Sequence, residues 1–178
     1  EASLNGAIIG LAQDYVGSNN INLLLPNGSF GTRLQGGKDA ASERYIFTQL
    51  NPLTRLIFPA IDDAIIEYNN DDGDFVEPIF YIPIIPMILV NGAKGIGTGF
   101  STDIMCYNPL QIINYLENKL ANNSNTSNSN NSNSNTNNDS KSIIIEPYYK
   151  GFKGKIIPLD ESCKKYLIKG IYEIIDFP

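Results

Sequence analysis

The sequence predicts an α+β fold for this chain of 178 residues. Two segments, 3–12 and 108–120, repeat apolar residues every three to four positions, as a helix with one buried face does. Between and after them lie short apolar runs bounded by glycine, proline or asparagine, which is typical of strands joined by turns. Because 42% of the residues are hydrophobic, the chain can bury the core of one large domain or two small ones.

The first helical segment starts almost at the first residue, without a leading Met, and we therefore expect the chain to be a piece of something longer. Ser3 is expected to be its N-cap. Its apolar face is expected to consist of Leu4, Ala7, Ile8, Leu11 and Ala12. Residues 17–20 would end this helix, residues 21–25 would form a short strand, and residues 26–28 would form a turn.

The middle of the chain combines one short helix with extended segments. Residues 52–58 predict the helix, and the acidic residues 69–74 predict a solvated loop. Residues 75–90 are expected to be extended, because Pro83 and Pro86 favour sheet edges or bends.

The second helical segment is expected to begin with Asn108 as the cap and Pro109 in the first turn. Its predicted apolar face consists of Leu110, Ile113, Leu116 and Leu120. After it, nearly every residue from 121 to 140 is Asn, Ser or Thr, which cannot bury enough apolar surface to offset the entropy of ordering. We therefore expect a disordered insertion over residues 121–141. Strand-like runs follow at 143–145, 166–168 and 171–175.

Composition excludes several classes of function. No apolar run reaches the roughly 20 residues of a membrane-spanning helix, and no secretory signal opens the chain, so we expect a soluble, intracellular protein without a membrane partner. Cys106 and Cys163 lie far apart and there is no histidine, which argues against a disulfide framework and a zinc site. Without histidine, catalysis must use Tyr, Arg, Lys or carboxylates, or groups from elsewhere.

The net charge of −6 at first argues against nucleic acid as a partner, but the charges are unevenly distributed. Residues 61–80 contain seven acidic residues and no Lys or Arg. The glycine-rich stretch that precedes Tyr45 instead carries Arg33, Lys38 and Arg44. A cationic surface can therefore exist on an acidic chain.

A second glycine-rich segment, NGAKGIGTGF, spans residues 91–100. Its glycine spacing matches neither the GxxxxGK[ST] phosphate loop nor GxGxxG, so it is a weak indication of nucleotide binding. One interpretation is a tight bend with Ile96 tucked into a core. The other is that the alternating glycines leave Ile96 as one bulky apolar residue on a bare loop, suited to inserting between base steps.

Arg44 and Tyr45 stand next to each other at the end of the first glycine-rich stretch. A surface tyrosine beside an arginine is most often a packing or hydrogen-bonding pair. The wider sequence favours another interpretation: residues 28–47, GSFGTRLQGGKDAASERYIF, and residues 83–102, PIIPMILVNGAKGIGTGFST, resemble the breakage-reunion core of the eukaryotic type IIA DNA topoisomerases. The resemblance extends over residues 3–120 and resumes at residues 147–156, PYYKGFKGKI.

This resemblance implies a winged-helix-type DNA-binding and cleavage domain at residues 1–107, followed by the start of a mixed α/β tower domain at residues 108–178. It implies that Tyr45 attacks a DNA phosphate to form a 5′-phosphotyrosyl link, with Arg44 on the scissile phosphate. Free tyrosine has a pKa of about 10, so its phenol needs help to become a nucleophile. Reversible cleavage would then serve ATP-dependent passage of one duplex through another, in a nuclear homodimer.

The DNA-binding residues implied by the resemblance are Arg33, Lys38, Ile96 and Lys94. Ile96 matches the family's intercalating isoleucine, whereas Lys94 stands where the family usually has Glu and would strengthen DNA binding. Glu43 and Phe100 also depart from the usual family residues, and an acid beside Arg44 would weaken its phosphate contact. The asparagine tract is not a family feature and is frequent in AT-rich protozoan genomes of the malaria-parasite kind.

Mg²⁺ and ATP are expected to bind outside this chain, because neither the acidic sequence motifs of the family's metal site nor the ATPase module occurs in it. We therefore expect half of an active site that is completed by the partner protomer, and no DNA cleavage by this chain alone. The main alternative is a non-catalytic DNA-bending module, which would need Ile96 but not Tyr45. A small-molecule enzyme with a glycine-rich cofactor loop is a weaker alternative, because no acidic ribose-binding residue or histidine base follows the loop.

Overall fold

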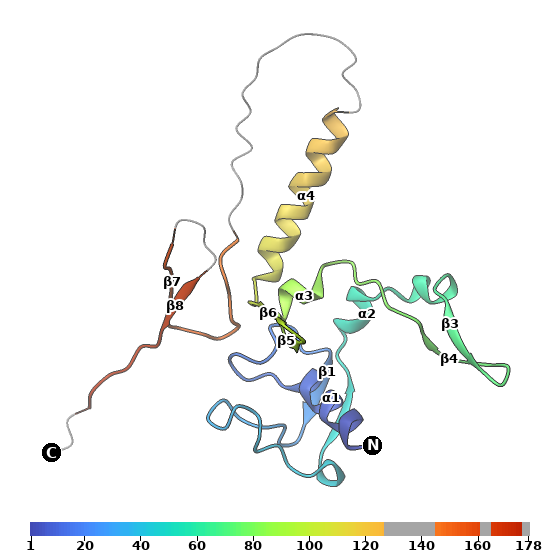
Figure 1. Cartoon of the computed structure of the whole chain (residues 1–178), viewed down its shortest axis with the longest axis horizontal. Helices are drawn as coiled ribbons and strands as arrows, with labels where there is room; N and C mark the ends of the chain where they lie inside the picture. Colours follow the sequence, from blue (N-terminus) through green and yellow to red (C-terminus); the bar gives the residue numbers. More distant parts are fainter. Residues whose placement is uncertain (127–144, 161–164, 176–178) are drawn as a thin grey trace.

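The computed structural model describes residues 1–126, 145–160 and 165–175, and it has the predicted mixture of helices and strands (Figure 1). The helices are α1 (Ala2–Ala12), α2 (Thr54–Ile57), α3 (Met87–Val90) and α4 (Pro109–Thr126), with 3-10 turns η1 (Glu43–Tyr45) and η2 (Ala60–Ala64). The strands are β1 (Leu24–Asn27), β2 (Phe47–Leu50), β3 (Tyr68–Asp71), β4 (Asp74–Pro78), β5 (Ala93–Gly97), β6 (Phe100–Ile104), β7 (Lys155–Pro158) and β8 (Tyr166–Lys169).

The strands form four antiparallel pairs, β1–β2, β3–β4, β5–β6 and β7–β8, and within the described part of the chain no two pairs join into a larger sheet. The long connection between β1 and β2 contains the first glycine-rich stretch, whereas β3–β4 and β5–β6 are tight hairpins. In Figure 1 the β3–β4 hairpin extends away from the rest of the chain beyond α2. None of the helices within the described ranges is long and apolar enough to cross a membrane.

Two small apolar clusters hold these elements. The first contains Ala12, Phe30 and Ile46, and joins the end of α1 to the segments on either side of the glycine-rich stretch. The second contains Ile85, Val90 and Ile112, and joins α3 to α4. The predicted site residues follow Phe30, precede Ile46 or lie just after Val90, so both clusters support the site.

Both long helices exist, but the predicted buried faces are only partly right: Ala12, Ile113 and Leu116 are in or beside a core cluster, while other predicted members are exposed. In α1 the N-cap is Glu1 and not Ser3, and Leu4 is 65% exposed, whereas Ala12 is buried and Ile9 packs beside it. In α4 the predicted cap is confirmed, because the side chain of Asn108 accepts a hydrogen bond from the Leu110 amide at 2.9 Å. Its buried residue is Ile112, with Ile113 and Leu116 beside it, while Leu110 and Leu120 are exposed. Each helix contacts its cluster over a short length only, so its apolar periodicity alone does not identify that face.

Three loop or strand predictions also change. The predicted strand 21–25 lies at Leu24–Asn27 instead, because Leu23 and the residues before it hydrogen-bond to other segments. The predicted acidic loop 69–74 is the tip of a hairpin, in which Asp72 and Gly73 adopt positive φ angles of 50° and 102° that suit a two-residue turn. The predicted glycine-rich loop 91–100 is largely the β5–β6 hairpin.

The remaining segments give a mixed result. The short helix predicted at 52–58 is confirmed as α2, and the strand at 166–168 as β8. Met87–Val90 is a helical turn and not extended, since Pro86 precedes it in the cap position. Residues 171–175 form no strand. Of the predicted insertion, residues 121–126 continue α4, while residues 127–141 lie outside the described residues, as do residues 143 and 144.

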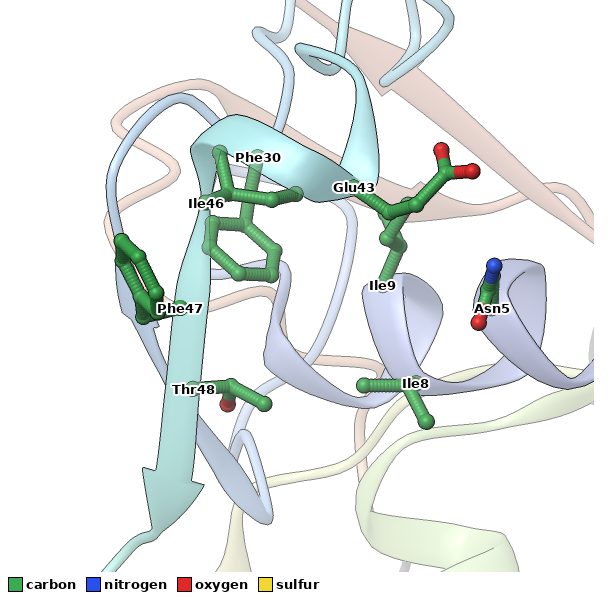
Figure 2. A pocket seen from close by; sticks show the side chains of 8 residues that line it. All are labelled: Asn5, Ile8, Ile9, Phe30, Glu43, Ile46, Phe47 and Thr48. Atoms are coloured by element: carbon green, nitrogen blue, oxygen red, sulfur yellow. The ribbon is translucent and has the colours of Figure 1, made fainter.

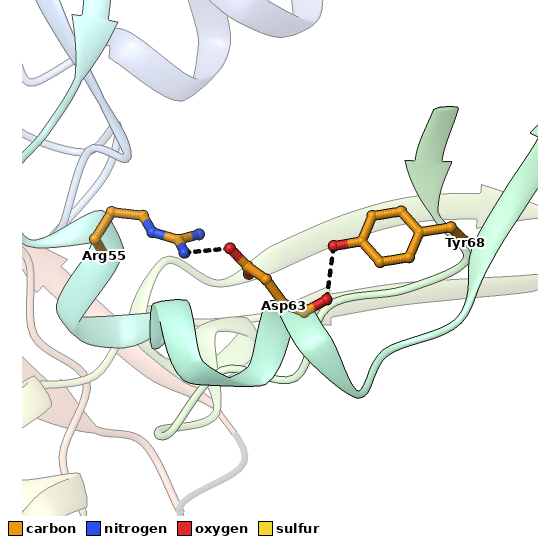
Figure 3. A network of polar contacts seen from close by, with 3 residues as sticks. All are labelled: Arg55, Asp63 and Tyr68. Atoms are coloured by element: carbon orange, nitrogen blue, oxygen red, sulfur yellow. Dashed lines mark hydrogen bonds and ion pairs between the residues drawn. The ribbon is translucent and has the colours of Figure 1, made fainter. Parts of the chain in front are cut away.

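The base of the projecting hairpin carries a polar network of Arg55, Asp63 and Tyr68 (Figure 3). The guanidinium of Arg55 pairs with the carboxylate of Asp63 at 2.6 Å, and the Tyr68 hydroxyl donates to the backbone carbonyl of Asp63 at 3.0 Å. This hydrogen bond from Arg55 to Asp63 raises the pKa of the guanidinium. Both side chains of the ion pair are about two-fifths exposed, so the pair orients η2 against α2 more than it stabilises the fold.

Candidate functional site

Tyr45 ends the 3-10 turn η1 and lies directly before strand β2. The next residue, Ile46, has extended backbone and a buried side chain, whereas Tyr45 and Phe47 are each 72% exposed. Because side chains alternate along extended backbone, burying Ile46 turns the Tyr45 phenol outward. Among the described residues neither Tyr45 nor the exposed Arg44 has a side-chain hydrogen-bond partner. The interpretation of Arg44 and Tyr45 as a hydrogen-bonding pair therefore finds no support among these residues.

The inner side of this turn faces a small cavity of about 170 Å³ between α1, η1 and β2 (Figure 2). Its walls come mainly from apolar side chains, with the Glu43 carboxylate and the Asn5 amide among the polar groups. Small-molecule sites usually measure about 300–1,000 Å³, so this cavity is too small to hold a nucleotide cofactor. Tyr45 and Arg44 do not line it, which places them on the outer surface.

A second hollow, of about 700 Å³, lies near the base of the β3–β4 hairpin. None of the predicted site residues lines it; its lining consists of Asp63, Ala64, Ile66, Glu67, Tyr68, Phe75 and Ile79. The chemistry expected of Tyr45 therefore has no enclosed chamber and requires a ligand that binds across the surface.

The glycine-rich stretch before Tyr45 is held in one shape by Asp39. The Asp39 carboxylate accepts two hydrogen bonds from Thr32, one from its amide at 2.8 Å and one from its hydroxyl at 2.7 Å. These two hydrogen bonds lower the pKa of Asp39. Residues 32–39 thus form a closed loop that carries Arg33 and Lys38 at defined positions.

Gln13, at the end of α1, holds the same loop from inside. Its side-chain amide donates to the carbonyls of Phe30 at 3.0 Å and Gly37 at 3.3 Å, and its oxygen accepts from the Tyr15 hydroxyl at 3.4 Å. Gly37 has a φ of +81°, and a Cβ built on it would lie 2.6 Å from the Tyr15 hydroxyl oxygen, so no other residue fits there. Sequence reasoning missed Gln13, Thr32 and Asp39; a carboxylate seven residues after a threonine in a glycine-rich loop was the available signal.

The predicted cations are not equivalent. Arg33 is exposed, but one of its guanidinium nitrogens donates to the Val16 carbonyl at 3.0 Å, which links the loop to the turn after α1. The ammonium of Lys38 and the guanidinium of Arg44 are exposed and have no partner within the described ranges. Arg33 therefore has a structural contact in addition to its free donors, while Lys38 and Arg44 can give their full charge to an anion.

The β5–β6 hairpin presents Ile96 at its tip. Ile96 pairs with Ser101 in the ladder, and its side chain is 91% exposed, so the interpretation that it is tucked into a core is wrong. A short ladder holds it more rigidly than a bare loop would. Lys94, also on β5, lies 3.7 Å from the Asp103 carboxylate, and both side chains are more than 70% exposed. This ion pair partly offsets the charge that Lys94 would present to DNA.

No group of three or more His, Cys, Asp or Glu residues within the described ranges could hold a metal ion. Close to Tyr45, Asp39 is engaged by Thr32 and Glu43 stands without a second carboxylate in the cavity lining. The residues present therefore do not fit a Mg²⁺ site, and the arrangement around Tyr45 offers a nucleophile and cations only.

An exposed tyrosine beside exposed cations, on a loop held by its own hydrogen bonds, suits an anionic polymer. A model of the family described as the A-type subunit of DNA gyrase/topoisomerase IV matches residues 1–176. The chain belongs to this family. Its relatives are the eukaryotic type II enzymes that the two quoted motifs predicted, and the α+β class is that of a solved topoisomerase core.

DNA topoisomerase 2 of Arabidopsis thaliana is 51% identical over 178 residues, which is 99% of this chain and 11% of that protein. A protein of Dictyostelium discoideum called DNA topoisomerase 2, mitochondrial, is 47% identical over 158 residues, 89% of this chain and 11% of its own length. The crystal structure of the Plasmodium falciparum topoisomerase II DNA-binding, cleavage and re-ligation domain matches with a TM-score of 0.81 and 43% identity, over 98% of this chain and 21% of that chain.

The chain spans about one tenth of the length of these curated topoisomerase relatives. Family and fold therefore come directly from the similarity. Neither shows the role of an individual side chain.

Proposed function

We propose that this chain is the part of a type II DNA topoisomerase that carries the DNA-cleaving tyrosine, and that Tyr45 is that tyrosine. The observation that supports it most strongly is the exposed Tyr45 phenol beside the exposed Arg44 guanidinium, with the neighbouring Ile46 anchored in the core. Both groups are exposed on the same turn. A duplex can reach this surface, whereas a small substrate would find no enclosing pocket.

In the proposed reaction the Tyr45 hydroxyl oxygen attacks the phosphorus of a DNA phosphodiester. The phenol gives up its proton as its oxygen bonds to phosphorus, the bond from phosphorus to the 3′-oxygen breaks, and the 3′-oxygen takes up one proton and leaves as a hydroxyl, so that protons balance. One phosphodiester is exchanged for another, so the reverse attack by the 3′-hydroxyl reseals the strand without ATP. The strand is thus opened and closed without hydrolysis.

Arg44 is the group best placed to stabilise the transition state. Its guanidinium can donate two parallel hydrogen bonds to the oxygens of the attacked phosphate and offset the charge that develops there. Lys38 and the free donors of Arg33 would contact neighbouring phosphates, which gives salt-dependent binding with little sequence preference. Ile96 would insert between base pairs and bend the duplex, and Lys94 would contact phosphate near it.

The larger assembly is proposed from the resemblance. Mg²⁺ and ATP would bind to parts of the enzyme outside this chain, and a second protomer of a homodimer would complete the active site. No carboxylate cluster among the described residues could hold Mg²⁺, so its ligands would come from outside this chain. Residues 1–107 would be a winged-helix-type domain and residues 108–178 the start of the tower, with Tyr107 and Pro147 paired across that boundary.

We propose the nucleus as the site of action, as for eukaryotic enzymes of this kind, although the Dictyostelium relative is named as mitochondrial. The non-catalytic DNA-bending module is not favoured, because the relatives that this chain matches are named topoisomerases. The exposed phenol of Tyr45 also has no use in that alternative.

The test uses the full-length enzyme with Mg²⁺ and end-labelled plasmid, denatured during the reaction so that any covalent adduct is trapped. Peptide mapping is expected to find the adduct on Tyr45 through a 5′-phosphate. Tyr45→Phe removes only the attacking oxygen, so it should abolish the adduct, a loss of at least about a thousandfold for an essential nucleophile.

Tyr172→Phe is the matched control, because Tyr172 is 84% exposed and lies outside the proposed site. This variant should form the adduct at the wild-type level. An adduct on another residue, or an unchanged adduct in Tyr45→Phe, would show that Tyr45 is only a DNA contact.

A further inference from the structure

Asn20 is a buried amide at which four distant segments of the chain meet. It is 7% exposed, and its side-chain nitrogen donates to the carbonyls of Val90 at 2.9 Å, Tyr107 at 3.1 Å and Tyr148 at 3.0 Å. Its side-chain oxygen accepts from the Lys150 amide at 2.8 Å. An amide nitrogen has two hydrogens, so three carbonyls share them, and the donor capacity of Asn20 is used fully.

Asn91 adds a second contact between the same segments. Its side chain accepts from the Ile21 amide at 3.0 Å and donates to the Ile21 carbonyl at 2.9 Å, so it pairs with Ile21 as a neighbouring strand would. Two residues after Asn91, strand β5 begins, and Tyr107 follows shortly after β6 ends. Asn20 and Asn91 therefore hold both ends of the β5–β6 hairpin (Figure 1). Ile96 lies on β5, close to the turn of this hairpin.

The other end of the Asn20 segment leads to Tyr45. The Asn51 side chain donates to the Asn22 carbonyl at 2.9 Å, and the Asn51 amide donates to the Leu23 carbonyl at 3.0 Å. Strand β1 then pairs along its whole length with β2, which begins two residues after Tyr45. A continuous series of hydrogen bonds thus runs from the two ends of the β5–β6 hairpin, through residues 20–27, to strand β2, which follows Tyr45.

We infer that Asn20 is a positioning residue that sets the place of Ile96 relative to Tyr45. This inference rests on the proposed function, in which both side chains act on the same DNA segment. Tyr45 precedes β2 and Ile96 lies on β5, and these two strands belong to separate two-stranded sheets within the described part of the chain. Their relative position therefore depends on residues 20–27, the segment that links the two sheets. This segment binds the β5–β6 hairpin through the hydrogen bonds of Asn20 and through those between Ile21 and Asn91.

The experiment is a double-mutant cycle in the full-length enzyme. Asn20→Asp keeps the side-chain size and the acceptor but removes the donors that face three carbonyls. Bending of a doubly labelled duplex is measured by energy transfer, and cleavage by the trapped Tyr45 adduct. Asn70→Asp is the matched control, because Asn70 lies on the distant β3–β4 hairpin and its side-chain oxygen, which accepts from the Gly73 amide, is retained.

If Asn20 acts through Ile96, then Asn20→Asp and Ile96→Ala should each lower bending and cleavage by about tenfold, and the double variant should fall no more than about twofold below either. If Asn20→Asp caused a general loss of structure instead, its loss would multiply with that of Ile96→Ala. Combined with Lys38→Ala, whose loop is held by Gln13 and Asp39, the loss from Asn20→Asp should multiply. Asn70→Asp should match the wild type.

Asn91→Asp is the second variant, used whether or not Asn20→Asp folds. It loses the donor to Ile21 and keeps the acceptor, so it should show the same lack of additivity with Ile96→Ala at a smaller amplitude. Losses that multiply with those of Ile96→Ala, or wild-type bending in a folded Asn20→Asp or Asn91→Asp enzyme, would overturn the inference. Failure of the proposed function is seen separately, since the wild-type enzyme would then form no adduct on Tyr45.

Discussion

Ile46 shows how one buried side chain can set the position of its neighbours. Its side chain packs with Ala12 and Phe30, and the extended backbone then turns Tyr45 and Phe47 to the outside. A tyrosine that is 72% exposed would otherwise gain by packing part of its ring. Its exposure is thus a consequence of the Ile46 anchor, and this anchor is as important to the site as Arg44.

Asp39 offers a test of the loop that carries the cations. Its pKa is lowered by hydrogen bonds from Thr32, so the carboxylate stabilises the loop above the pKa of the unfolded chain. This contribution is lost as the pH falls below about 4, through the lower folded pKa, because protonation removes the charged acceptor. The Thr32 amide should therefore exchange its hydrogen several-fold faster in acid, after correction for the intrinsic rate.

The comparison that checks this uses Asp39→Asn, which should show fast exchange at Thr32 already at pH 7 and no further step in acid. Asp14→Asn, which alters an exposed carboxylate outside the loop, should keep the wild-type step. An unchanged exchange rate in Asp39→Asn would mean that Gln13 alone holds the loop.

The α4 helix is held by a single fully buried side chain. Ile112 is 2% exposed and packs with Ile85 and Val90, whereas Leu110 on the same helix is 68% exposed. We expect Ile112→Ala to lower the free energy of opening of α4 by about 2–5 kcal/mol, from lost burial and the cavity left behind. Hydrogen exchange of the α4 amides in the full-length protein measures this energy.

Leu110→Ala is the control in the same helix and should change that free energy by less than about 0.5 kcal/mol. Equal effects of the two substitutions would show that Leu110 is buried in the full-length protein. The cluster around Ile112 would then not be the main attachment of α4.

The β5–β6 hairpin shows the same dependence on other parts of the chain. Its own contacts are a five-pair ladder and the exposed ion pair of Lys94 with Asp103, and an isolated two-stranded hairpin is only marginally stable in water. Both ends of the hairpin are held by residues of another segment: Asn20 bonds to Val90 and Tyr107, and Ile21 bonds to Asn91. The hairpin therefore needs the rest of the chain to hold Ile96 in place.

Many large apolar side chains are exposed across the whole chain. They include Leu4 on α1, Phe75 in the β3–β4 hairpin, Phe80 after it, and Ile171 and Ile174 near the end of the described residues. Where exposed apolar side chains gather into large patches, they mark interaction surfaces or favour aggregation. We expect the 178-residue chain produced alone to self-associate and to bind an apolar dye, despite its net charge of −6.

Size-exclusion chromatography with light scattering measures this association, and the full-length protein is the control that should bind little dye per chain. A monodisperse monomer of 19.6 kDa without dye binding would show that these side chains rearrange into a core of their own.

The identity of the site could be predicted from the sequence, because it depends on residue types at fixed spacing. Tyr45, Arg44 and Ile96 lie within two long motifs, and short-range rules also predicted the Asn108 cap, α2 and β8. Such features involve neighbours along the chain, so local sequence contains the information for them. The same holds for the α+β class, which follows from the two periodic segments and the runs between them.

The contacts between distant residues came only from the tertiary structure. Sequence periodicity predicted Ala12 as buried correctly, but it also predicted Leu4 and Leu110, which are exposed, and it missed Ile112. Burial depends on which partner segment lies opposite each helix. Asn20 meets partners 70 to 130 residues away, and no local pattern distinguishes it from its neighbour Asn19. The sequence therefore indicated which residues we propose for the chemistry. Long-range hydrogen bonds and packing decided how these residues are held, since those depend on segments that meet only after folding.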